Sequence, residues 1–321
     1  MSQTRGSPKI RRWWADVGLT RPSLSDLALP AVAGLAAVLY LVNLTMSGYA
    51  NTYYALAAQA GSQSWSAMFF GSLDASNFVT LDKPPLATWL MGLSVRFFGL
   101  GSWSVLVPQA LLGVATVVML FLAVRRSFGL PAAFIAGLVM ALTPVAVLIF
   151  RYDNPDAVLT FLLVAGAWAL GRGIERGRLR WALAAATLVG AAFLAKSLQA
   201  YLVLPAFALT WLVSAPGSIR RRLGGLAASL VLVLVASGWW VAIVELIPAS
   251  ARPYIGGSQT NSELELIFGY NGLGRLLGNE GSAAGIGPLS DDLGPGAASF
   301  TFGGTPGPLR LFNDQFVGEI G

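Results

Sequence analysis

Seven apolar blocks, each close to the length of a bilayer crossing, constrain this 321-residue chain more than any other feature. They cover about residues 27–46, 103–124, 130–150, 155–170, 179–195, 198–213 and 223–246. A helix needs about 20 apolar residues to cross the hydrocarbon core, and several blocks are nearer to about 17. Only 11% of the residues are charged, whereas a soluble domain has about a quarter. The sequence therefore predicts an all-α polytopic membrane protein, with its transmembrane region at 26–247.

The basic residues predict the orientation of the chain in the membrane. If the basic leader, residues 1–25, is cytoplasmic, that side holds two thirds of the 21 Lys and Arg residues, as the positive-inside rule expects. This placement accounts for the net charge of +6 without a nucleic-acid partner. We expect a multi-pass plasma-membrane protein whose loops 47–102 and 151–154 and tail 248–321 are extracytoplasmic.

Two segments outside the apolar blocks differ from them in length or composition. The long first loop, 47–102, contains a short apolar stretch, Leu86–Phe98, which predicts a re-entrant or interfacial helix. The tail, 248–321, is rich in Gly, Pro, Ser and Asn, and Gly278–Pro308 has the composition of a flexible loop. The chain stops without a domain-like ending, which is expected of a fragment or an N-terminal half that is followed by further spans.

Cysteine and histidine are both absent. This excludes disulfides, zinc sites of the His/Cys type, and nucleophilic catalysis by Cys or by a Ser–His pair. Acid–base chemistry is left to Asp, Glu, Lys, Tyr or water. Carboxylates without histidine are compatible with Mg²⁺ or Mn²⁺, although no spacing here demands a metal, and no other cofactor is indicated.

The first loop carries an acid–base pair directly before two prolines, Asp82-Lys83-Pro84-Pro85. Proline disfavours helix at the residue before it, so Lys83 is held extended at the start of the next helix, where a phosphate or pyrophosphate would be stabilised. The alternative is a salt-bridged pair that caps this helix. Asp74 has no capping pattern around it, and it is also compatible with an ordinary loop acid.

The second external loop places Arg151, Asp153 and Asp156 within six residues, between two apolar blocks. Charges at such a depth are costly unless they pair or face a cavity. The alternative is a self-neutralising turn in which Asp153 or Asn154 caps the helix opened by Pro155.

Two further ionisable residues lie at the ends of later blocks. Lys196 ends the fifth block, and either it snorkels to the interface or it faces a polar cavity. Glu245 lies near the end of the last block in an apolar run, and a glutamate has little stem with which to snorkel. Together they predict a wet, charged cavity at the outer membrane surface.

These motifs together resemble a known family. One early span, a long loop ending in "DKPPL", a short "RYDNPDA" loop and "FLAK" closing a later span are similar to the GT-C membrane glycosyltransferases of family 39. This family includes the protein O-mannosyltransferases and the lipid A aminoarabinose transferase. Stretches such as "GSWSVLVPQALLG" and "LELIFGYNGLGRL" look like its actinobacterial, mannosyltransferase-like branch.

The resemblance implies a GT-C-like helical bundle whose first external loop carries interfacial helices. It also implies transfer of a sugar, mannose-like, from a polyprenyl-phosphate carrier to an extracytoplasmic acceptor with inversion. On that basis Lys83, Arg151 and Lys196 would hold the phosphate, with Asp153, Asp156 and Glu245 supporting them. An acid of the first loop would be the general base that deprotonates the acceptor.

The chain departs from the family pattern at one point. Relatives carry the catalytic acid early in the first loop, where this chain has Ala50-Asn51-Thr52-Tyr53-Tyr54. Either Asp74 or Asp82 has taken over the role, with Asp74 preferred because Asp82 adjoins Lys83, or transferase activity has been lost. The remaining alternatives are a non-catalytic protein that binds or transports the polyprenyl-phosphate lipid and a scaffolding subunit of an envelope complex.

Overall fold

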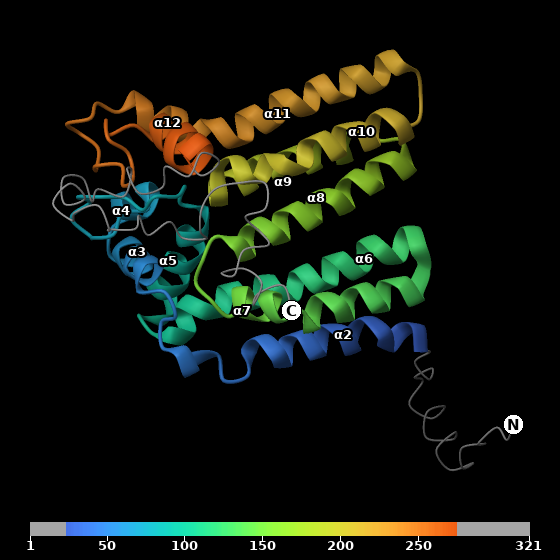
Figure 1. Ribbon diagram of the computed structural model, residues 1–321, viewed down its shortest axis with the longest axis horizontal. Coiled ribbons are helices and arrows are strands. Elements are labelled where there is room, and N and C mark those ends of the chain that lie inside the picture. Colours follow the sequence, from blue (N-terminus) through green and yellow to red (C-terminus); the bar gives the residue numbers. More distant parts are fainter. Residues whose placement is uncertain (1–23, 275–321) are drawn as a thin grey trace, which may run out of the picture.

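The computed structural model describes residues 24–274, with side chains described for residues 26–272. Within this range all regular structure is helical, apart from two isolated bridges, Ser72–Thr80 and Val79–Tyr254. Long helices lie side by side in a bundle, and shorter helices gather at one end of it (Figure 1). That end is called the loop end below, and it is formed by α3 (Thr52–Gln63), α4 (Trp65–Phe70), α5 (Leu86–Phe98) and α12 (Glu263–Glu265).

Five stretches in the described part of the chain are long and apolar enough to cross a membrane. They are Asp26–Ser47, Ser102–Leu142, Asp156–Arg176, Leu179–Ser214 and Ile219–Leu246. The helices that form them are α2 (Leu24–Leu41), α6 (Ser102–Leu142), α8 (Asp156–Arg176), α9 (Leu179–Lys196), α10 (Leu204–Ser214) and α11 (Ile219–Leu246). The prediction of an all-α, multi-pass membrane protein is therefore confirmed.

Two of these stretches reverse direction. A straight helix of the 41 residues of α6 would be about 60 Å long, twice the hydrocarbon thickness. Gly129, with φ 82° and ψ −179°, breaks it, and the second arm runs back along the first toward α7 (Pro144–Phe150) (Figure 1). Ser197, with φ 48°, breaks the other stretch before η2 (Ser197–Val203) and α10. The separate arms coincide with the predicted blocks, but seven crossings stay a prediction.

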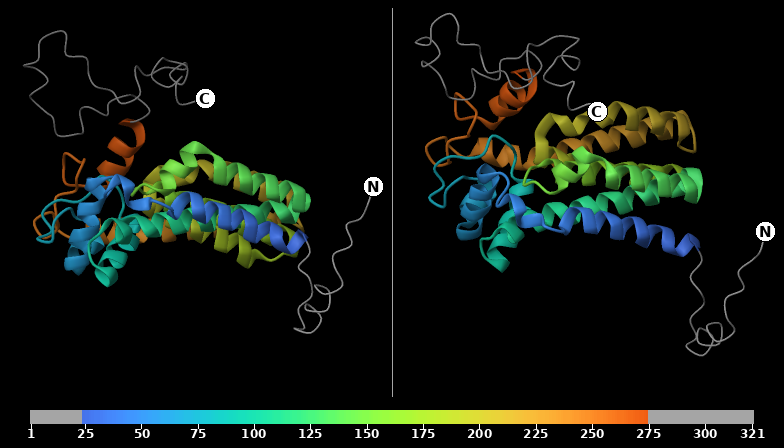
Figure 2. Two further views of the ribbon diagram at one scale, coloured as in Figure 1. Left: turned by 90° about the horizontal axis from the view of Figure 1, so that it is seen from below. Right: turned by 60° about the horizontal axis from the view of Figure 1, so that its bottom comes forward.

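The first loop is mostly helical. After η1 (Leu44–Ser47) it forms α3 (Thr52–Gln63), α4 (Trp65–Phe70) and α5 (Leu86–Phe98). The predicted short helix at Leu86–Phe98 is confirmed with the same bounds. These helices lie across the end of the bundle rather than along it, at the end opposite to the start of α2 (Figures 1 and 2).

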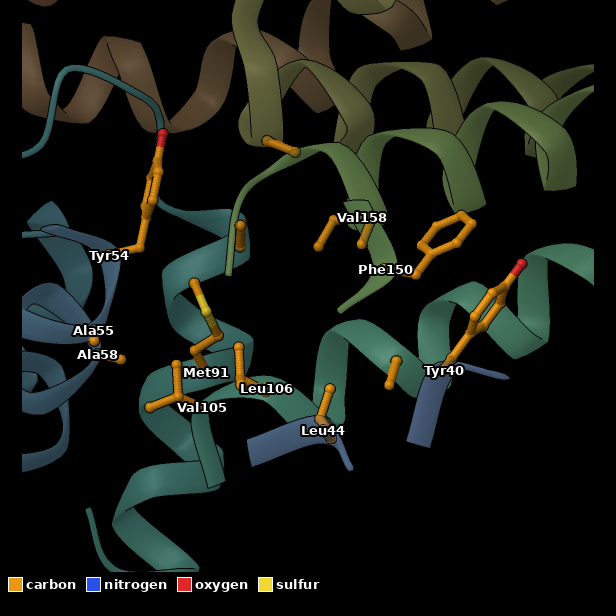
Figure 3. Packing of buried hydrophobic residues seen from close by; sticks show 14 of the residues in the cluster. Tyr40, Leu44, Tyr54, Ala55, Ala58, Met91, Val105, Leu106, Phe150 and Val158 are labelled. Carbon is orange, nitrogen blue, oxygen red and sulfur yellow. The ribbon is translucent and has the colours of Figure 1, made fainter. Parts of the chain in front are cut away.

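Aromatic and small side chains together build the core. Tyr40 of α2 and Phe150 of α7 have ring centroids 5.2 Å apart, and both side chains are buried (Figure 3). A Cβ on Gly113 of α6 would lie 2.5 Å from Phe150, so only glycine lets that ring approach the helix. Small residues at such positions are typical of packed membrane helices.

The segment after α11 folds back onto the first loop. The Tyr254 N–H donates to the Phe78 carbonyl and the Thr80 N–H donates to the Tyr254 carbonyl, both over 2.9 Å. Then follow α12 (Glu263–Glu265) and the π-helical segment η3 (Leu266–Gly274). The predicted leader and the Gly278–Pro308 loop lie outside the described residues.

Candidate functional site

Lys83 is a buried cation at the loop end. Its side chain is 6% exposed, and its Nζ forms an ion pair with the Asp82 carboxylate and donates to the Asp82 carbonyl over 3.1 Å. The following helix, α5, begins after Pro85 and has no side-chain cap. The salt-bridged pair of the alternative interpretation is therefore present, but Asp82 does not cap this helix.

Residues from distant parts of the chain surround this pair. The Asp82 N–H donates to Tyr53 Oη over 3.2 Å, and Asn271 Nδ2 donates to the Asp82 carbonyl over 2.8 Å. Lys83 Nζ lies 5.2 Å from the ring centroid of Tyr270. Burial and then the Asp82 charge raise the pKa of Tyr53, which keeps its phenol neutral. These five residues are called the Lys83 site.

Lys196 lies at the same end of the bundle, in a second ion pair. It is the last residue of α9 and pairs with Asp156, the first residue of α8. Two residues later, Leu198 packs against Gly272, next to Asn271 of the Lys83 site. Lys83 thus contacts η3 through Tyr270, and the segment that follows Lys196 contacts η3 at Gly272. Lys196 is paired with Asp156 rather than free to snorkel.

Arg151 has a different environment. Its guanidinium donates to the carbonyls of Leu39 and Val42, each over 2.7 Å, and of Asn43 over 2.8 Å. These carbonyls end α2, where a helix leaves acceptors without intrahelical partners. The contacts of Arg151 hold the end of α2 and do not join it to the Lys83 site.

Asp153 is fully buried beside the start of α3. Its Oδ1 accepts from the Asn51 N–H over 2.6 Å, and its Oδ2 is buried without a partner. Burial raises the pKa of Asp153 to about 7, against a smaller effect of the Asn51 hydrogen bond. The capping role belongs to Asn154, whose Oδ1 accepts from the Asp156 N–H over 2.8 Å.

Two other predicted acids are engaged in local structure. Asp74 accepts from the Phe78 N–H over 3.0 Å and so closes the turn between the bridged residues Ser72 and Thr80. Glu245 binds both terminal nitrogens of Arg252 over 3.1 Å each, and it also accepts from Ser262 Oγ and from a backbone N–H of α12. Glu245 thus anchors the segment that returns to the first loop.

Glu263 is a functional candidate that the sequence analysis missed. Its side chain is 1% exposed and its Oε1 has no partner. Burial and the charge of Glu245 raise its pKa to about 8, while Arg252 and Lys83 act in the opposite direction. The sequence offered one signal: Glu263 directly precedes the family-like stretch "LELIFGYNGLGRL", which itself contains a second acid, Glu265. Because the composition of the tail indicated a loop, no functional residue was predicted within it.

The sequence left open whether Mg²⁺ or Mn²⁺ is used. Among residues 24–274, no group of three or more acidic side chains is placed so that it could hold a metal ion.

The chain is similar to several known proteins. Residues 82–240 match the family described as dolichyl-phosphate-mannose-protein mannosyltransferase. Two Bacillus subtilis (strain 168) proteins, named "Putative mannosyltransferase YkcB" and "Putative mannosyltransferase YycA", are 44% and 45% identical over 261 and 253 residues. These matches cover 81% and 79% of this chain but only 36% and 37% of the relatives. The chain thus spans little more than a third of their length.

Two solved structures share the fold. They are ArnT from Cupriavidus metallidurans in the apo state and ArnT bound to undecaprenyl phosphate, with TM-scores of 0.55 and 0.53. Both are 24% identical to this chain, and they cover 70% and 67% of it. The matches span 43% and 41% of those chains. At this identity the likeness establishes the arrangement of the helices.

Proposed function

Because this chain belongs to the GT-C membrane glycosyltransferases of family 39, we propose that it serves the transfer of a sugar from a polyprenyl-phosphate carrier. The acceptor lies outside the membrane, the sugar is mannose-like, and the anomeric configuration is inverted. Lys83 binds the phosphate of the carrier. Support for the carrier class comes from the ArnT neighbour that binds undecaprenyl phosphate.

The observation that carries this proposal is the environment of Lys83. The buried ammonium of Lys83 is oriented by Asp82, and Lys83 lies three residues before Leu86, the first residue of α5, whose first-turn N–H groups have no side-chain cap. A helix N-terminus and a fixed cation together favour a phosphate, through the dipole and through charge-assisted hydrogen bonds. Tyr53 and Asn271 add neutral polar groups around the pair. The Lys196–Asp156 pair gives a second cation at the same end of the bundle.

The bundle also offers a place for hydrocarbon. A cavity of about 280 Å³ lies between α8, α9, α10 and α11, and nearly all of its lining is apolar. Its walls include Leu170, Ala182, Val189, Phe207, Trp211 and Leu230. A carrier whose phosphate binds at the loop end extends its isoprenoid tail along the helices, and a cavity of this lining accommodates part of such a tail.

For the acceptor hydroxyl we retain Asp74 as the general base and assign Asp82 to hold Lys83. Asp74 already accepts one hydrogen bond, from the Phe78 N–H, and it is half-buried at the tip of its turn. Its second oxygen is the one that would take the proton. Asp153, with an unpartnered buried oxygen, is the competing carboxylate.

Binding and transfer measurements on two variants test the proposal. Lys83→Gln should weaken binding of undecaprenyl phosphate by about 10- to 100-fold, because one charge-assisted hydrogen bond is lost, with little effect on undecaprenol. Asp74→Asn should retain binding and lower turnover by about 10²- to 10⁴-fold. Arg96→Gln is the control, since Arg96 stacks on Trp65 away from the site.

The results also separate the alternative function. Binding of undecaprenyl phosphate that depends on Lys83, with no transfer by the wild-type protein, would establish the lipid-binding or transport function instead. This alternative has its own structural support, since Asp74 and Asp82 are both already engaged by protein groups. Equal binding of undecaprenol and undecaprenyl phosphate would refute both functions.

A further inference from the structure

A cluster of arginine and tryptophan side chains lies toward the end of the bundle opposite to the loop end, where α8 ends and α9 begins (Figure 1). Trp168 and Arg172 come from α8, four residues apart and so on one face of that helix. Arg180 and Trp181 come from the first turn of α9. These four residues are called the Trp–Arg cluster, and none of them lines the apolar cavity between α8, α9, α10 and α11.

Two indole rings orient the guanidinium group of Arg172. Its Cζ atom lies 5.1 Å from the ring centroid of Trp168 and 5.5 Å from that of Trp181. The two rings meet edge to face, with centroids 5.5 Å apart, and the Cζ atom of Arg180 lies 5.7 Å from the Trp181 ring. A ring attracts a cation within about 6 Å of its centroid. The rings therefore hold both arginines in place, but they do not neutralise their charges.

This region has a surplus of positive charge and of hydrogen-bond donors. Residues 172–180 contain four arginines and one acid, Glu175, whose carboxylate is already paired with Arg126 at the α6 turn. In the described part of the chain, Arg172 Nε and Trp181 Nε1 are buried and find no acceptor. Guanidinium and indole groups offer donors only. The ligand that complements the Trp–Arg cluster is therefore an anion with several acceptor oxygens.

The position of the cluster on membrane helices decides which anion this is. The α8 stretch and the stretch that α9 opens are both long and apolar enough to cross a membrane. Tryptophan is enriched at the level of the lipid head groups, and basic residues collect on the cytoplasmic side. These tendencies explain the residue types, but they do not require an arginine that contacts rings on two neighbouring helices. A basic pocket between membrane helices is an arrangement that binds anionic lipid head groups.

We propose that the Trp–Arg cluster is a binding site for an anionic phospholipid of the leaflet at this end of the bundle. Arg172 binds the head-group phosphate through its terminal nitrogens, and Arg180 adds a second positive charge. The rings of Trp168 and Trp181 contact the glycerol and the first methylene groups of the lipid. On the orientation predicted from the basic residues, this is the inner leaflet. The site is separate from the Lys83 site, so its test does not depend on the proposed function.

Native mass spectrometry of the full chain in detergent measures the binding of dioleoyl-phosphatidylglycerol and of dioleoyl-phosphatidylcholine. The wild-type protein should bind the anionic lipid about tenfold more tightly. Arg172→Gln should remove most of this preference, because a charge-assisted hydrogen bond to the phosphate is lost. Arg172→Lys should weaken binding almost as much, since lysine lacks the planar group that stacks on the rings. Arg221→Gln is the matched control and should keep most of the preference, because Arg221 is an exposed arginine of the first turn of α11, at the same end of the bundle.

Three results would overturn the inference. Equal losses in Arg172→Gln and Arg221→Gln would mean that the arginines act only through the total charge of this end. Equal binding of the two lipids by the wild-type protein would show that no anion site exists. Displacement of the anionic lipid by an equal concentration of inorganic phosphate would identify a free anion as the ligand. Should Arg172→Gln fail to fold, Arg180→Gln replaces it, because Arg180 is exposed, and it should lower the affinity for the anionic lipid more than Arg221→Gln does.

Discussion

At the scale of single residues, the loop end contains carboxyl groups in very different surroundings. Asp82 and Asp156 each face a lysine, whereas Asp153 and Glu263 are buried with an oxygen that has no partner. A buried carboxyl without a cation favours its protonated form. Asp82 and Asp156 therefore form ion pairs with the two lysines, whereas burial raises the pKa of Asp153 and of Glu263 and favours their uncharged forms.

Asp153 provides a test of this contrast through stability. Its pKa is about 7 in the folded protein and about 3.9 when exposed, so the folded state binds the proton more tightly. The stability that this proton gives is present at low pH and is lost as pH rises toward and through about 7. Asp153→Asn keeps an acceptor for the Asn51 N–H, and it should raise the melting temperature by several degrees at pH 8 and clearly less at pH 5, where only part of this stability has been lost.

Thermal unfolding in detergent, followed by tryptophan fluorescence at both pH values, checks this. Asp153→Ala is the companion variant, and it should destabilise the protein at both pH values because it leaves the Asn51 N–H without its acceptor. An equal shift of Asp153→Asn at pH 5 and pH 8 would contradict the assigned burial.

Some of these residues were predictable from the sequence and others were not. Lys83 and Lys196 were identified because a charge beside an apolar block needs an explanation. The partner of Lys83 is its neighbour Asp82, a pairing that the sequence suggested. Lys196 instead pairs with Asp156, 40 residues away, and no local pattern encodes that contact. The partners of Arg151 could not be predicted for a different reason: all three are backbone carbonyls, which every residue carries whatever its side chain.

At the scale of the helices, close packing depends on a few glycines. A Cβ on Gly190 of α9 would lie 2.5 Å from the Ala236 Cβ and 2.9 Å from the Val233 carbonyl oxygen of α11. Neither atom is the end of a flexible side chain, so the two helices would have to separate. Gly190→Ala should destabilise the protein by about 1–3 kcal/mol, despite the better helix propensity of alanine.

The melting temperature of the purified protein measures this effect. Gly238→Ala is the matched control on α11, because nothing lies within 4 Å of an added Cβ there, and it should be neutral or stabilising. If Gly190→Ala melts with Gly238→Ala at the wild-type temperature, α9 and α11 are not packed as closely as described.

The helices themselves were largely predictable because apolar length is a strong local signal. Leu86–Phe98 has the predicted bounds, whereas α8 extends six residues beyond the predicted end and α11 begins four residues early. Both extensions add polar or basic residues that hydropathy excludes from a span. The π-helical segment η3 was not anticipated, because its position depends on contacts with the first loop rather than on its own sequence.

At the scale of the whole molecule, the two ends of the bundle should face different compartments. The exposed Ser76 lies between α4 and α5, and the exposed Ser127 lies in α6 two residues before its break at Gly129. The helices α4 and α5 and the turn of α6 are at opposite ends of the bundle (Figure 1). In this cysteine-free protein, Ser76→Cys should react with an impermeant maleimide in intact cells, and Ser127→Cys only after permeabilisation. The reverse pattern would invert the orientation inferred from the basic residues.

The hydrogen bonds between the first loop and the returning segment also constrain biosynthesis. Asn271 donates to the Asp82 carbonyl across 189 positions of sequence, with every membrane helix of the described region after the first encoded between them. At about 5–20 residues per second, a ribosome needs roughly 10–40 s to synthesise that interval. During this time Lys83 and Asp82 are already translated while Tyr270 and Asn271 are not. The Lys83 site is therefore among the last parts of the described fold to be completed, and inserting the helices comes before forming the site.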